Sequence, residues 1–179
     1  MCIRDRLKKQ SLAGIDKEAL YKGVRAGLKN QGGKARSAVA TIYKQLSYEE
    51  IEPLLPAIYE ATVTPAPSGI MFADGVRLSG LELLAKHKIK EGIPLCMEVM
   101  GIGRWGLVKR VPPCLDILES YGGAAKSELP KLKPYYEQLK AKPNPSDKNK
   151  QTIKRIEEVI KKVNSDKTKQ KLRSLKIAA

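Results

Sequence analysis

Aromatic side chains are scarce in this sequence of 179 residues, which contains one Phe, one Trp and seven Tyr. A core built around aromatic rings is therefore excluded, and Leu, Ile, Val, Ala and Met must supply most of the buried surface. Hydrophobic residues make up 42% of the chain, enough for one folded domain or for about three or four helical repeats with a tail. No apolar run approaches the roughly twenty residues that a membrane-spanning helix needs, so no membrane span is predicted.

Histidine and cysteine are also rare, with one His and three Cys in the chain. Cys96 and Cys114 fall within apolar helical patterns, where a free Cys behaves as a small buried hydrophobe. His87 is the single histidine, and a closed zinc site would need ligands that this chain does not cluster. Because His87 has no obvious Ser, Cys or carboxylate partner, we interpret it as a helix-end residue. The sequence predicts no catalytic residue, no metal site and no cofactor.

Acidic residues are outnumbered, with 19 Asp and Glu against 34 Lys and Arg and a net charge of +15. The excess is concentrated in residues 126–179, where sixteen basic and six acidic residues give +10, leaving +5 for the rest. Such a charge attracts nucleic acid, anionic membranes or acidic proteins, but lysine-rich solvated helices produce the same count without any such partner. The segment has few aromatic or Arg residues among its lysines, which favours the solvated interpretation.

The first six residues, MCIRDR, resemble the translated end of a sequencing adaptor used in metagenomic libraries. We therefore expect that residues 1–6 are an artefact and that the gene continues upstream; the alternative is a genuine basic N-terminus. Under the adaptor hypothesis the missing signal peptide carries no information, so localisation stays unknown and Cys2 enters no argument.

A repeat organises the middle of the chain. Arg36 and Pro53 lie seventeen positions apart, as do Arg77 and Pro94, and the two pairs are offset by forty-one residues. A period of this size is typical of stacked helical pairs. Apolar residues at helical spacing predict helices over 16–28, 35–46, 47–63, 76–87, 93–100, 106–122 and 124–140.

The flanking residues support these boundaries. Asp16 is placed to cap the first helix, and Ser47 with Glu50 three residues later matches a capping box. A linker over 142–149 is followed by a helical stripe, a turn at 164–166 and a short final helix around 172–175. We expect stacked helical repeats over 7–142 and, over 143–179, a basic helical hairpin that caps the open end of the stack.

Two connections contain candidate partner-contact residues. Met71 and Phe72 follow a Pro-rich loop, and Arg104 stands beside the single Trp, Trp105. An indole next to a guanidinium can grip a partner, but Trp105 can equally fill the joint between two repeats, which we favour. The apolar loop is likewise expected to fold back over the helices. The three glycines in 101–106 match a dinucleotide-binding fingerprint, but no strand-helix alternation surrounds them, so nucleotide binding is not predicted.

The repeat units resemble HEAT repeats. The resemblance rests on Ala35–Val39 with Leu54–Pro56, on Asp74–Arg77 with Ile93–Leu95, and on Lys109–Val111 with Leu129–Leu132. It implies an all-α HEAT-like α-solenoid of antiparallel helix pairs. In that family an Arg in the first helix commonly pairs with a carboxylate near a repeat turn, which implies that Asp74 and Asp116 are candidate partners for Arg36, Arg77 or Arg110.

The segments PAPSGIMFADGVRLSGLELLAKH and YGGAAKSELPKL also resemble the C-terminal portion of large bacterial proteins of planctomycete type. This resemblance implies a fragment of a larger bacterial protein. We expect a non-catalytic interaction or scaffold module whose partner is a protein or another domain of the full-length chain. The alternatives are a basic repeat module that binds nucleic acid or another polyanion and, as the lesser one, an accessory domain of an upstream enzyme.

Overall fold

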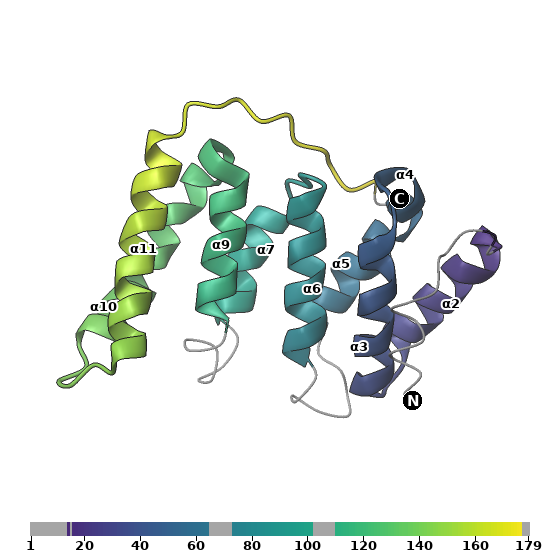
Figure 1. Cartoon of the computed structure of the whole chain (residues 1–179), viewed down its shortest axis with the longest axis horizontal. Coiled ribbons are helices and arrows are strands. Elements are labelled where there is room, and N and C mark those ends of the chain that lie inside the picture. The colour runs from purple at the N-terminus through teal and green to yellow at the C-terminus, as the bar shows by residue number, and fades with distance from the viewer. Residues whose placement is uncertain (1–13, 15, 65–72, 102–109, 177–179) are drawn as a thin grey trace. The chain divides into compact units, whose positions relative to one another are not determined.

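The computed structural model of this chain is built from helices (Figure 1). It describes residues 14, 16–64, 73–101 and 110–176. These residues contain no strand, and their only β pairing is an isolated parallel bridge between Ile89 and Arg173. The predicted all-α class is therefore confirmed. The chain divides into an N-terminal unit, made of Met1–Leu83 with Leu175–Ala179, and a C-terminal unit, Leu84–Ser174.

The N-terminal unit contains a series of short helices. Asp16 caps the first of them, since its Oδ1 accepts a hydrogen bond of 3.0 Å from the Glu18 amide. The predicted capping box is also formed, because the Ser47 hydroxyl accepts from the Glu50 amide and the Glu50 carboxylate accepts from the Ser47 amide. The helices are α2 (Lys17–Lys29), α3 (Gly33–Ile42), the 3-10 turn η1 (Tyr43–Gln45), α4 (Tyr48–Ile51), the 3-10 turn η2 (Glu52–Leu54), α5 (Leu55–Val63) and α6 (Ala73–Lys86), which crosses the unit boundary at Leu83.

Proline divides the segment that the sequence presents as one helix over 47–63. Pro53 lies in η2 and Pro56 in the first turn of α5, where a missing amide donor costs no helical hydrogen bond. Among the described residues, Tyr43 is the one aromatic side chain in the buried core of this unit, and its burial raises its pKa to about 12. The buried core residues of this unit include Val24, Leu28, Ala40, Leu46, Ile51, Leu54, Leu55, Ile58, Val76 and Leu81.

The C-terminal unit begins with the end of α6 and continues with α7, which is buried almost all round, as its apolar sequence predicts. Pro112 and Pro113 lie in the first turn of α9, so the helix begins only at Val111. The 3-10 helix η4 packs against α9 and α11, and α11 lies beside α9 (Figure 1). The elements are α7 (Gly92–Gly101), α9 (Val111–Tyr121), η4 (Gly122–Leu132), α10 (Lys133–Lys140) and α11 (Asp147–Ser165).

The predicted C-terminal helical hairpin is wrong in its second half. Helix α11 forms, but residues 166–176, here called the strap, contain no helix and run in an extended course (Figure 1). Local periodicity is outweighed by contacts made elsewhere: Arg173 exchanges backbone hydrogen bonds with Lys88 at 2.8 Å and Lys90 at 2.9 Å. These bonds satisfy backbone groups that a helix would have paired internally.

Candidate functional site

The four residues that the sequence singles out as partner contacts, Met71, Phe72, Arg104 and Trp105, lie outside the described residues. Their role therefore stays a prediction. The described part of the chain offers a different surface, a groove in the C-terminal unit.

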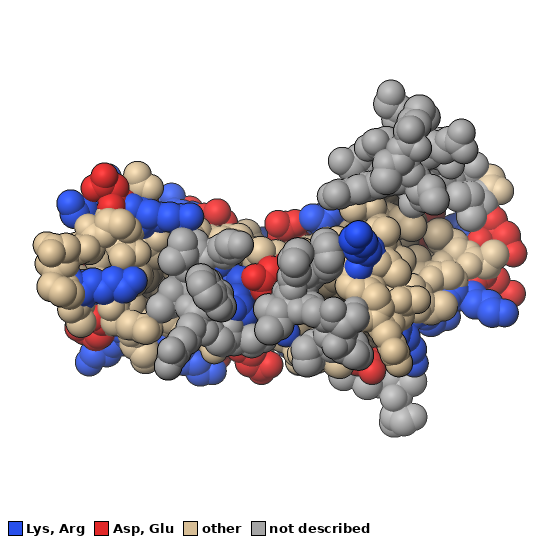
Figure 2. Space-filling model, turned by 90° about the horizontal axis from the view of Figure 1, so that it is seen from below, with Lys and Arg blue, Asp and Glu red and all other residues tan. Residues whose placement is uncertain are grey.

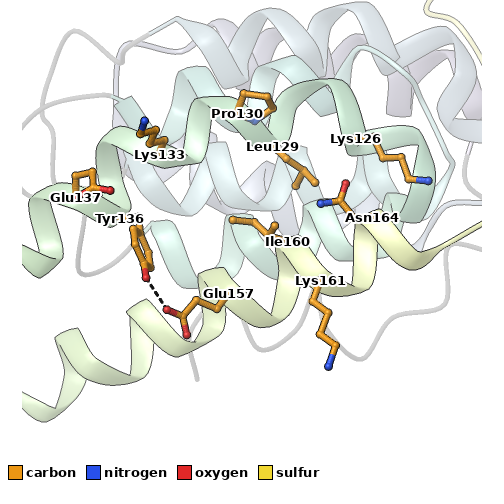
Figure 3. Close-up of a pocket in the computed structure, with 10 residues that line it drawn as sticks. All are labelled: Lys126, Leu129, Pro130, Lys133, Tyr136, Glu137, Glu157, Ile160, Lys161 and Asn164. Atoms are coloured by element: carbon orange, nitrogen blue, oxygen red, sulfur yellow. Dashed lines mark hydrogen bonds between the residues drawn. The ribbon is translucent and has the colours of Figure 1, made fainter.

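This groove runs between η4 and α10 on one side and α11 on the other, with a volume of about 640 Å³ (Figure 3). Its floor is apolar. Leu129 is 6% exposed, while Ile160 on α11 is half-buried and Pro130 is exposed at the edge. The remaining lining residues are polar: Lys126, Lys133, Tyr136, Glu137, Glu157, Lys161 and Asn164.

One end of the groove is closed by a hydrogen bond between helices. The Tyr136 hydroxyl on α10 donates to Glu157 Oε1 on α11 at 2.6 Å (Figure 3). Lys140 Nζ in turn donates to the Tyr136 hydroxyl at 3.1 Å, and this contact raises the pKa of Lys140. Glu137 stands on the same side of the groove (Figure 3). The carboxylates of the groove are therefore gathered at this end.

The other end is basic. Lys126 and Asn164 lie there, with Lys161 on the adjoining turn of α11 (Figure 3). Lys126 Nζ donates to the backbone carbonyl of Asp166 at 2.9 Å. Within the described residues, Lys126, Lys133 and Lys161 make no ion pair, although all three are exposed. Lys133 stands beside Glu137 at the opposite end (Figure 3), and Lys140 contacts Tyr136 there, so basic residues accompany the carboxylates at that end.

Two basic residues elsewhere on α11 are neutralised by carboxylates of α9. Arg155 Nη2 lies 2.5 Å from both Asp116 Oδ1 and Glu119 Oε2, and Lys162 Nζ lies 2.7 Å from Glu119 Oε1. The hydrogen bond from Lys162, together with Arg155, lowers the pKa of Glu119. These contacts join α9 and α11, so Arg155 and Lys162 help to hold the two helices together.

The strap has unneutralised charge of its own. Lys167, Lys169 and Lys171 alternate along it and are exposed, and none of them forms an ion pair with a described residue. The face in Figure 2 is more mixed: in the part belonging to the C-terminal unit, basic and acidic side chains are interspersed rather than joined in one basic patch. This face therefore carries no continuous basic patch.

Three arginines, Arg36, Arg77 and Arg110, are buried near the starts of α3, α6 and α9. Arg36 Nη2 donates to two carbonyls at the end of α5, Ala61 and Thr64, both at 3.4 Å. Arg110 Nη1 donates to the Val99 carbonyl near the end of α7 at 3.3 Å. A cation at a helix C-terminus is favourable because the exposed carbonyls there carry partial negative charge. These arginines contribute to packing and helix termination.

The HEAT resemblance implies Asp74 and Asp116 as carboxylate partners of the buried arginines, and the two residues differ in what they contact. Asp74 Oδ1 lies 3.8 Å from Arg77 Nη1, as that resemblance implies. Asp116 instead contacts Arg155, a residue that sequence spacing did not connect with it.

The residue types most often used in catalysis, one His and two Cys in the described chain, are buried. His87 is buried at the turn between α6 and α7, and its carbonyl accepts a hydrogen bond of 3.1 Å from Arg173 Nη1. Cys96 and Cys114 are buried free thiols on α7 and α9. In the described part of the chain, no group of three or more His, Cys, Asp or Glu residues is arranged to hold a metal ion. Nor is any helix there both long enough and apolar enough to cross a membrane.

Sequence periodicity did not locate the groove. It placed Leu129, Tyr136 and Ile160 on buried stripes, and each does lie on the inner side of its helix. What periodicity cannot give is how closely two helices approach, and here the helices leave a gap beside these residues. No known protein family matches this chain, and no curated protein or solved structure is detectably similar to it.

Proposed function

We propose that this chain is a non-catalytic, HEAT-like helical-repeat module that acts by binding a segment of a partner protein. Two features support the repeat architecture. Within the N-terminal unit, the Ser79 hydroxyl on α6 donates to the Ala40 carbonyl on α3 at 3.2 Å. Lys44, in the turn η1 that follows α3, pairs with Glu82 on α6 at 2.6 Å. Within the C-terminal unit, α9 and α11 are joined by Arg155. Contacts between successive first helices are what a solenoid of antiparallel pairs requires.

The groove between α10 and α11 is the observation that carries the binding proposal. It combines an apolar floor with charged rims, the composition of a protein recognition surface. Its volume lies within the range of about 300–1,000 Å³ usual for binding pockets. Because it lies between helices rather than in a loop, its shape is fixed by the packing of the unit.

A second function, binding of nucleic acid or another polyanion, is favoured by the strap. Lys167, Lys169 and Lys171 are exposed and alternate along an extended segment, so their side chains repeat about every 6.6 Å. Phosphate contacts by such lysines would give strongly salt-dependent binding without sequence preference.

Selection from a displayed random-peptide library with the intact chain as bait tests the first function. We expect enrichment of peptides with a shared pattern. Titration of a fluorescent DNA duplex at several salt concentrations tests the second function. Enriched peptides combined with weak duplex binding support the proposal; a tight duplex complex with a steep salt slope and no enriched peptide would overturn it.

A further inference from the structure

We infer that the strap binds the phosphate backbone of a nucleic-acid duplex, with Lys167, Lys169 and Lys171 each contacting a phosphate and no base being read. This inference rests on the second function proposed above, and it names the site and the form of the nucleic acid. It is carried by the way in which the strap is held and by the row of lysines that it presents (Figure 1).

The strap is fastened at two points. At its start, the Asp166 carboxylate accepts a hydrogen bond of 2.7 Å from the Gly123 amide. Further along, the Arg173 amide donates to the Lys88 carbonyl at 2.8 Å, and the Arg173 carbonyl accepts from the Lys90 amide at 2.9 Å. Between these two points, no backbone hydrogen bond joins the strap to another element of the described chain. Because both points are fixed before a partner arrives, less conformational entropy is lost on binding.

The three strap lysines lie on one side of this extended segment, since alternate residues of an extended chain point the same way. All three are exposed, whereas Gln170 between them and Leu172 after them are half-buried. At about 6.6 Å per repeat, the row spans roughly 13 Å. One strand of a duplex carries a phosphate for about every 3.4 Å of helix axis, so each ammonium group has a phosphate within reach.

The charge of the row is not compensated by its surroundings. Within the described chain, none of the three strap lysines forms an ion pair. The carboxylates beside the strap each have a cation of their own, because Lys126 lies next to Asp166 and Lys90 lies 4.0 Å from Glu91. Three ammonium groups held in a row repel one another, and a polyanion relieves that repulsion.

The composition of the row selects the partner. Residues 167–171, KTKQK, contain no aromatic residue, Met or Arg, which are the residues enriched in protein interfaces, where Lys is depleted. A single strand exposes its bases and needs aromatic faces on which they stack. A duplex keeps its bases stacked inside and presents phosphates, which lysine contacts as a compact point charge without selecting a sequence. A duplex is therefore favoured over an acidic protein segment and over a single strand.

The test is an anisotropy titration of the full chain against three fluorescein-labelled probes: a DNA duplex, an oligothymidine strand of the same length and an oligoglutamate peptide. The strap variant changes Lys167, Lys169 and Lys171 to Gln, and a conservative variant changes the same three to Arg. The matched control changes Lys22, Lys34 and Lys148 to Gln. These lysines are also exposed and form no ion pair with described residues, so the loss of net charge is identical.

The strap variant should bind the duplex at least about tenfold more weakly than wild type at roughly 50 mM salt. The slope of log affinity against log salt concentration should fall by about 2.7, since each lost phosphate contact contributes about 0.9. The control should stay within about threefold of wild type with little change in slope, and the arginine variant should keep wild-type affinity. Thermal melts identify any variant that fails to fold, although exposed lysines contribute little to stability.

Equal weakening in the strap variant and the control would show that binding comes from the overall charge, which would overturn this inference and leave the second function standing. Binding of oligothymidine or oligoglutamate as tight as that of the duplex would also overturn it. A wild-type chain that binds no duplex even at low salt would count against the second function itself.

Discussion

The carboxylate of Asp166 accepts a hydrogen bond of 2.7 Å from the backbone amide of Gly123, which fastens the end of α11 to the start of η4. The same carboxylate accepts from the Thr168 amide at 2.8 Å. Because Asp166 is the C-terminal cap of α11 and has an extended backbone, these bonds direct the chain into the strap instead of a second helix. Asp166 is therefore the residue at which the predicted hairpin fails.

Because the Asp166 carboxylate accepts these hydrogen bonds, the stability of the protein is predicted to fall at acid pH. Hydrogen bonds from Thr168, through its side chain and its amide, and from the Gly123 amide lower the pKa of Asp166 from 3.8 to about 2. A carboxyl with a depressed folded-state pKa contributes stability that is complete above its unfolded pKa and is lost as the pH falls through the folded one. Wild type should therefore melt above Asp166→Asn at neutral pH, and the gap should narrow between about pH 4 and pH 2.

Thermal melts across this pH range measure the effect. Thr168→Val removes the side-chain donor but keeps the amide, so it should lose part of the pH-dependent stabilisation. A melting difference between wild type and Asp166→Asn that is the same at pH 2.5 and pH 6 would show that the carboxylate does not fasten the strap.

Gly122 lies directly against this contact. Its φ is +54°, and a Cβ atom built on it would lie 2.0 Å from Asp166 Oδ2. Gly122→Ala therefore combines a backbone conformation that L-residues rarely adopt with a steric clash, and we expect a loss of about 2–3 kcal/mol in the free energy of unfolding. Urea denaturation measures it.

Gly23 provides the matched control for that substitution. It lies inside α2, and a Cβ atom there would meet nothing within 4 Å. Gly23→Ala should stabilise the chain by about 0.5–1 kcal/mol, because Ala restricts the unfolded chain and favours the helix. Equal losses at both positions would contradict the strain assigned to Gly122.

Sequence reasoning succeeded where the cause is local. Asp16 capping α2 and the Ser47–Glu50 box involve residues at most three positions apart, so spacing alone places them. The apolar character of α7 likewise follows from its own residues. Each of these features depends on the chain nearby and not on the rest of the fold.

Prediction from the sequence failed for features that depend on contacts between residues far apart in the chain. The strap is held by Gly123 and by the turn at Lys88–Lys90, which lie about 40 and 85 positions earlier in the chain. Helical spacing of Leu172 and Leu175 contains no information about those contacts. The groove depends on the separation of α10 and α11. Asp116 on α9 pairs with Arg155 on α11, a contact between distant parts of the sequence. Tertiary contacts override local preference in all three cases.

The buried arginines give a further prediction. Arg36 is 5% exposed and donates to the Ala61 and Thr64 carbonyls at the end of α5. Arg36→Ala leaves those carbonyls without a donor and removes a packed side chain, so we expect a loss of about 2 kcal/mol or more by urea denaturation.

Arg25 is the control for this loss. It also donates to a carbonyl, that of Pro53 at 2.9 Å, but it is exposed, so water can replace it. Arg25→Ala should cost no more than about 0.5 kcal/mol. A loss at Arg36 no larger than at Arg25 would show that burial of the guanidinium does not stabilise the end of α5.

The reactivity of the Cys96 and Cys114 thiols measures whether the contact between α7 and α9 is closed. Cys96 and Cys114 are fully buried, and Cys96 Sγ lies 3.9 Å from the Cys114 carbonyl. The neighbouring Cys114 thiol and burial both raise the pKa of Cys96, and the thiolate is the form that reacts with disulfide reagents. In a Cys2→Ala background, native protein should therefore release almost no thionitrobenzoate, whereas protein in concentrated urea should release two equivalents.

The native reaction rate should follow the rate at which the helices open, and should fall when added salt or lower temperature slows unfolding. Rapid reaction of both thiols in native buffer would mean that α7 and α9 do not form a closed interface.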